Sequence, residues 1–172
     1  LSTTDRIELG VGGGTGTMTV DKGGLVHASS YTYVTDTGGS SGTLNLLGNS
    51  GGRGVLETGA VVNGNGTGIL NLDGGVLRAT RDESNFLNGF AALTVGGEGA
   101  WFDTNGHDIV VGTGFSGSSG LNKQDVGTLT LTGINTYTGA TQIDGGTLQL
   151  GDGGTSGAIG SRIINNGILA FN

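Results

Sequence analysis

Apolar and polar residues alternate along most of this chain, in short runs that repeat. One five-residue phrase recurs: a small residue, usually Gly, then any residue, then an apolar, a polar and an apolar residue. It begins at positions 16, 42, 68, 91 and 127, and the first three copies are evenly spaced. Strict alternation is the period of a β-strand with one buried face. We therefore expect a short strand at each copy of the phrase.

The alternation also predicts which side chains of these strands point inward. The apolar residues of four copies should face a core: Met18, Val20, Leu44, Leu46, Leu70, Leu72, Leu129 and Leu131. The polar residues between them should face water: Thr19, Asn45, Asn71 and Thr130.

A second phrase consists of a polar residue, Gly-Gly and another short alternating run. It occupies residues 22–28, 73–79 and 144–150, and a looser copy covers 166–171. Gly at these positions supplies the positive φ that sharp turns need. By position within the phrase, His27 matches Arg78 and Gln149, so we expect His27 to be exposed.

A five-residue strand with two inward side chains cannot bury a core alone, but stacked copies can. A repeat of roughly 20 to 26 residues predicts an all-β solenoid, in which each coil adds short strands to long parallel sheets. A β-sandwich or jelly roll does not require one phrase to recur and ranks below. Residues 28–41, 80–90 and 112–126 break the rhythm, and we expect them to project as loops. The middle one could form a short helix, with Phe86 and Phe90 on its apolar side.

Composition narrows the class further. The 172 residues include 40 Gly, no Pro and no Cys. So many Gly residues disfavour helices, the missing Pro excludes collagen, and the missing Cys excludes disulfides and thiolate sites. A net charge of −7 with only seven Lys and Arg argues against a nucleic-acid partner. No apolar run is long enough for a membrane-spanning helix, and Leu1 begins in a polar segment without a signal peptide, as expected of a piece of a longer protein.

Motifs that carry chemistry lack the context they need. A G-x-G-x-x-G run at 112–117 and G-x-S-x-G runs at 38–42 and 48–52 each require a following helix, and none is indicated. Residues 96–101 start like a calcium-binding nonapeptide, but Trp101 stands where the ligand Asp belongs. We therefore expect no catalytic residue, no cofactor and no metal site.

Residues 127–151 carry a family resemblance. They contain Leu-Thr-Leu-Thr-Gly at 129–133, Asn-Thr-Tyr-Thr-Gly at 135–139 and Gly-Gly-Thr-Leu at 145–148, and this segment resembles the passenger-associated repeat of bacterial autotransporters. The resemblance implies that residues 1–172 form a right-handed parallel β-helix, exported by type V secretion. The protein would be secreted, or displayed on the cell surface and anchored through the outer membrane by a C-terminal barrel. That barrel, the only membrane-bound part, would lie beyond Asn172.

The resemblance further implies a non-enzymatic stalk and adhesin that binds host cells or matrix, or associates with itself. The alternative is a β-helix enzyme acting on polysaccharide, which would need acidic residues clustered on one face. The 14 acidic residues here are scattered. A third possibility is a pure scaffold. Aromatic and Arg residues are common anchors of binding surfaces, so the candidate contact residues are Tyr31, Tyr33 and Arg81.

Overall fold

The computed structural model describes residues 2–154 and 157–172, and every element in this part of the chain is a β-strand. No helix long and apolar enough to cross a membrane occurs among these residues. The strands are β1 (Ser2–Thr4), β2 (Ile7–Gly10), β3 (Thr15–Val20), β4 (Leu25–Ala28), β5 (Tyr31–Thr35), β6 (Ser41–Asn49), β7 (Gly52–Arg53), β8 (Val55–Thr58), β9 (Ala60–Asn63), β10 (Thr67–Asp73), β11 (Val76–Ala79), β12 (Leu87–Asn88), β13 (Ala92–Thr94), β14 (Ala100–Asp103), β15 (Ile109–Val111), β16 (Gly114–Ser116), β17 (Leu121–Gln124), β18 (Thr128–Leu131), β19 (Thr141–Ile143), β20 (Thr147–Leu150), β21 (Ile163–Asn165) and β22 (Ile168–Phe171).

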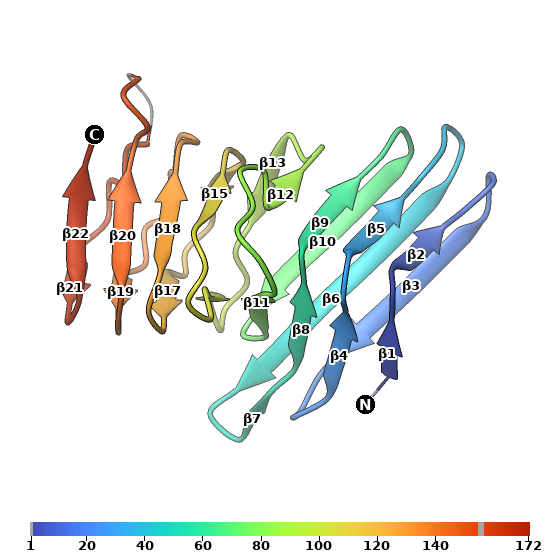
Figure 1. The fold of residues 1–172 in the computed structure, drawn as a ribbon, viewed down its shortest axis with the longest axis horizontal. Helices are drawn as coiled ribbons and strands as arrows, with labels where there is room; N and C mark the ends of the chain where they lie inside the picture. Colours follow the sequence, from blue (N-terminus) through green and yellow to red (C-terminus); the bar gives the residue numbers. More distant parts are fainter. Residues whose placement is uncertain (1, 155–156) are drawn as a thin grey trace.

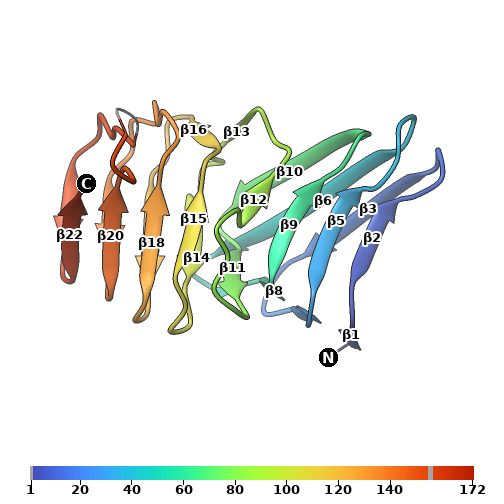
Figure 2. The same ribbon diagram turned by 45° about the horizontal axis from the view of Figure 1, so that its top comes forward.

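The strands stack in parallel from coil to coil, with the two chain ends at opposite ends of the stack (Figure 1). One sheet of eight strands runs in the order β1-β4-β8-β11-β14-β17-β19-β21. Around the N-terminal half the walls are β3-β6-β10 and β2-β5-β9-β12, and the C-terminal half has β15-β18-β20-β22 and β13-β16. Figure 2 shows the same stack of strands turned by 45° about the horizontal axis. The chain is thus a parallel β-helix, which confirms the predicted fold class.

The even spacing of the first three phrases is a structural register. Strands β3, β6 and β10 pair in parallel, with Met18 opposite Leu44 and Leu44 opposite Leu70. Leu44 is fully buried and Leu70 is 3% exposed, while the side chains of Thr19 and Asn71 are exposed. The predicted strand parity is therefore confirmed in this sheet.

The Gly that opens each phrase has a steric reason. Gly16, Gly42 and Gly68 lie in one column of this sheet. A Cβ added to Gly42 would collide with the carbonyl oxygen of Val34, and one added to Gly16 would collide with that of Leu9. The preceding wall of the same coil crosses here at backbone contact distance, so only a residue without a side chain fits.

The coils become shorter toward the C-terminus. Val61 pairs with Leu87 at the full spacing of the first phrases, but Leu72 pairs with Val95 across a shorter interval. Later coils are shorter still, because Leu129 pairs with Leu148. The coils are therefore smaller from the middle of the rod onward, where β10 ends one sheet and β13 begins another.

This shortening changes the partners of the later phrases. The phrase at 127–131 forms β18, which pairs with the second phrase at 144–150 in β20. Leu129 is fully buried as predicted, but it lies outside the sheet of Leu44 and Leu70. Thr130 is only 7% exposed, so its predicted exposure is wrong; it sits in the ladder between Val110 and Gln149.

The three expected loop insertions are also wrong. Residues 28–41 contain β5, residues 80–90 contain β12, and residues 112–126 contain β16 and β17. The middle stretch forms no helix, and Phe86 is fully buried in the core instead of covering the rod. Strands with bulky or charged outward residues are part of the coils of the β-helix, as the Thr-rich strands are.

Candidate functional site

Two tyrosines stand on the outer face of β5. Along this strand Thr32 and Val34 are fully buried, while Tyr31 and Tyr33 are half-buried on the opposite face. Their rings meet edge to face, with centroids 6.1 Å apart and an interplanar angle of 76°. The alternation of β5 thus fixes two aromatic rings side by side on the outer wall.

The structure brings Arg81 onto this pair. The Arg81 guanidinium lies over the Tyr31 ring, 4.4 Å from its centroid, within the range of a cation–π contact. It can approach because residue 59 is Gly: a Cβ there would collide with the guanidinium. The predicted contact residues, far apart in sequence, therefore meet on one surface.

Glu83 completes the group. The Tyr31 hydroxyl donates a hydrogen bond of 3.3 Å to Glu83 Oε2. The Nε and Nη2 atoms of Arg81 are buried and have no hydrogen-bond partner among the described residues. We call Tyr31, Tyr33, Arg81 and Glu83 the tyrosine cluster. Sequence reasoning missed Glu83, which only the stacking of coils brings to Tyr31.

A polar rim adjoins the cluster. Glu8 on β2 lies opposite Tyr33 in the ladder, and Arg6 Nη2 contacts Glu8 Oε1 at 3.1 Å. The face over β2 and β5 thus combines aromatic surface with charges of both signs. Such a combination suits recognition of a polar macromolecular surface.

A ladder of ion pairs runs along the eight-stranded sheet and was not predicted. His27 Nδ1 lies 2.9 Å from Glu57 Oε2, and Arg78 Nη1 donates to Glu57 Oε1 at 2.9 Å. Arg78 Nε donates to Asp103 Oδ2 at 2.7 Å. His27 is therefore half-buried and bonded, and its expected exposure is wrong. Position within the phrase placed His27 and Arg78 in one column, but Glu57 and Asp103 lie outside the phrases.

The ion pairs shift the pKa values of Glu57 and Arg78. Burial acts to raise the pKa of Glu57, but hydrogen bonds from Arg78 and His27 outweigh it, so the pKa is lowered. The Asp103 hydrogen bond raises the pKa of Arg78 against the opposing effect of burial. Both groups are held in their charged forms, which is the pattern of a structural ion-pair network.

Trp101 is held by a neighbouring cation. The guanidinium of Arg53 lies over its ring, 3.6 Å from the centroid, and Trp101 Nε1 donates to the carbonyl of Glu98 at 2.9 Å. The residue that replaces the calcium ligand in the nonapeptide pattern thus packs against an Arg.

Lys123 is a buried cation of the rod. Its side chain is fully buried, and Nζ donates to the carbonyls of Gln124, Asp125 and Gly145 at 3.0, 2.7 and 3.1 Å. Burial lowers its pKa to about 8, while the charges of Asp125, Asp103 and Asp108 oppose this. Lys123 thus links the turn that follows β17 to Gly145 in the next coil.

The sequence motifs that resemble catalytic or nucleotide-binding sites lie in strands of the β-helix and in the turns between them. Gly114 within 112–117 belongs to β16, Gly42 ends the first G-x-S-x-G run inside β6, and the second run passes from β6 to β7. Across residues 2–154 and 157–172, no three acidic or His side chains gather as a metal site.

Comparisons with known proteins give two findings. Residues 121–150 match the family model of the passenger-associated-transport-repeat. Over 158 residues, 90% of this chain, the sequence is 32% identical to the "Adhesin BmaC autotransporter" of Brucella suis biovar 1 (strain 1330). The chain spans only 3% of the length of that curated relative. No solved structure gives a significant match.

Proposed function

From the premise that this chain is autotransporter passenger sequence, we propose that it is a non-enzymatic part of a surface-displayed or secreted adhesin. Its partner is a ligand on host cells or matrix, or a second copy of the chain. The observation that carries the proposal is the 32% identity to a named adhesin across 90% of this chain.

The parallel β-helix suits a protein that holds a binding surface away from its anchor. Each coil bonds to the next through parallel ladders, and most large apolar side chains lie in one continuous core. Because each coil supports its neighbours, the stack behaves as a rod whose length grows with the number of coils.

The tyrosine cluster is the contact surface that we propose. Tyr31 and Tyr33 are half-buried, so their rings are already ordered before binding and lose little freedom on contact. Arg81 is fixed over Tyr31 by the contact of its guanidinium with the ring. Preorganised Tyr and Arg side chains are the residue types that dominate binding energies.

A bead assay tests the adhesive function. Beads coated with the folded chain should attach to cultured cells, to a matrix protein or to one another, while beads coated with heat-unfolded chain should not. A parallel incubation with neutral and acidic polysaccharides tests the alternative. Depolymerisation of a polysaccharide without any bead attachment would contradict the proposal and favour a β-helix enzyme.

A further inference from the structure

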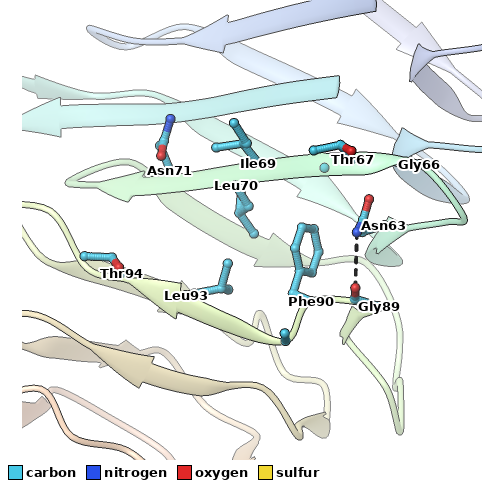
Figure 3. Close-up of a pocket in the computed structure, with 12 residues that line it drawn as sticks. Asn63, Gly66, Thr67, Ile69, Leu70, Asn71, Gly89, Phe90, Leu93 and Thr94 are labelled. Atoms are coloured by element: carbon cyan, nitrogen blue, oxygen red, sulfur yellow. Dashed lines mark hydrogen bonds between the residues drawn. The ribbon is translucent and has the colours of Figure 1, made fainter. Parts of the chain in front are cut away.

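A groove with a volume of about 530 Å³ opens between β10 and β13 (Figure 3). Asn63, Thr67 and Leu70 line one wall, and Phe90, Leu93 and Thr94 line the other. It lies in a different wall of the rod from the tyrosine cluster, which is centred on β5. Nothing in the adhesive function proposed above depends on it.

The groove exists because one coil is short. The chain from Leu87 to Val95 is shorter than the stretch from Val61 to Leu72 that it pairs with at both ends. The shorter segment therefore cannot follow β10 along its whole length. β13 meets β10 only near Leu72, where the Gly96 amide donates to the Leu72 carbonyl at 2.8 Å. At the other end Asn63 Nδ2 bonds to the Gly89 carbonyl at 3.2 Å. Between these two ties the two strands diverge.

Both walls of the groove are strand edges. The Thr67 amide donates to Ser40 beside β6, and backbone groups of alternate residues point to opposite sides of a strand. The N–H and C=O groups of Gly68 and Leu70 therefore point into the groove. On the facing wall the Val95 amide donates to the Ser116 carbonyl, so the Thr94 amide points toward the groove, and the bridge between Leu72 and Val95 closes the groove directly beyond it. On this side Leu72 of β10 is bridged by Val95, and no strand of the described chain pairs with the part of β10 that precedes it.

The lining has the chemistry of an unfilled strand position. None of its described residues is charged. Leu70 and Leu93 are buried, at 3% and 5% exposed, while Asn71 and Thr94 are exposed. A strand placed here would meet apolar side chains on its inner face and polar side chains on its outer face.

We propose that this groove binds an extended, uncharged peptide segment of a partner protein, which adds as a strand between β10 and β13. From Gly66 to Leu70 the wall offers about 16 Å of strand edge at about 3.3 Å per residue, enough for about four or five residues. Main-chain bonds to Gly68, to Leu70 and to the Thr94 amide supply affinity, as in other strand-addition complexes. The preferred sequence alternates apolar and polar residues, and Phe90 packs against the segment at the open end of the groove.

Selection from a displayed library of random heptapeptides tests this assignment. The library is selected on the wild-type chain and then counter-selected on Thr94→Trp, whose indole fills the mouth of the groove from an exposed position. Thr17→Trp is the matched control, because Thr17 is also exposed but lies on β3, two strands from the groove. The selected peptides should be uncharged and alternating. They should bind Thr94→Trp at least about tenfold more weakly, and Thr17→Trp as the wild type.

Amide hydrogen exchange with a selected peptide locates the contact. Exchange should slow at Gly68, Leu70 and Thr94, and stay unchanged at Thr67 and Ile69, whose amides point to β6. Failure to select any peptide that distinguishes Thr94→Trp from Thr17→Trp would overturn the proposal. So would protection of the same amides by cellotetraose alone, which would make the groove a neutral glycan site. Bead attachment in the adhesion assay is independent of either outcome.

Discussion

Replacement of Leu44 by Ala tests the packing of the rod where it is best defined. Leu44 is fully buried on the central strand of β3-β6-β10 and lies between Met18 and Leu70 in the register. It therefore has a neighbouring coil on both sides. Truncation removes apolar contacts with both coils and leaves a cavity that the parallel ladders prevent from collapsing.

The expected loss follows from burial. Full burial of a Leu side chain contributes about 1.5–3 kcal/mol, and the cavity raises the measured cost of Leu→Ala to about 2–5 kcal/mol. Because Leu44 is 0% exposed and held in a ladder on both sides, we expect a value in the upper half of that range. Urea unfolding followed by far-UV circular dichroism measures it, with an unchanged slope showing that both proteins unfold the same surface.

Asn45→Ala is the matched control, one residue along the same strand. Asn45 faces outward, donates to Thr19 at 3.1 Å and accepts from Asn71 at 2.7 Å. Water can replace these exposed hydrogen bonds, so Asn45→Ala should lower the free energy of unfolding by less than about 1 kcal/mol. Equal losses for the two variants, or a larger loss for Asn45→Ala, would refute the strand parity and with it the register of this sheet.

Three further variants probe other parts of the rod. The pKa of Lys123 is about 8 in the folded chain and about 10.4 unfolded, so the unfolded chain binds more protons between these values; stability should rise by about 2 kcal/mol from pH 7.5 to 9.5, and Lys123→Met should remove that rise in urea titrations. Because the pKa of Glu57 is lowered in the folded chain, its ionised form stabilises the fold above the pKa of the unfolded chain, and this stability is lost as the pH falls through the folded-state pKa. Arg78→Met should therefore lower the melting temperature at pH 7 and flatten the fall of the melting temperature between pH 5 and pH 3. Gly42→Ala would place a Cβ against the Val34 carbonyl and should prevent cooperative unfolding or cost more than about 3 kcal/mol by the same titration.

Local pattern was enough to predict the fold. The Gly-led phrases are strands because alternation determines which residues are buried, and Leu44 and Leu70 face the core as expected. The family resemblance at 127–151 was also correct, since the transport-repeat model matches 121–150.

Pattern failed where neighbouring coils differ. The strand Tyr31–Thr35 lies in a stretch that breaks the rhythm of the phrases, so the sequence predicts a loop there, although Thr32 and Val34 alternate with the tyrosines as in the other strands. The short coil before Val95 moves Leu129 into another sheet, and no local feature of the later phrases reveals the change of partner.

The candidate site was half predictable. Tyr31 and Tyr33 share a face by alternation alone, but the approach of Arg81 depends on the absence of a side chain at Gly59. The pairing of Tyr31 with Glu83 spans 52 residues, and the ion pairs of Glu57 cross between coils. Such contacts depend on the number of residues in each coil, which the phrases specify only for the first three.

The adhesive surface is tested most directly by attachment of beads coated with Tyr31→Ser/Tyr33→Ser. The buried Thr32 and Val34 keep β5 in place in this variant, and circular dichroism should confirm a folded chain. Thr17→Ser/Thr43→Ser, on another wall of the rod, controls for surface change alone. We predict that the tyrosine variant loses at least about tenfold in attachment and that the threonine variant attaches as the wild type. Unchanged attachment of the folded tyrosine variant would contradict the assignment of the tyrosine cluster and leave the chain as a scaffold.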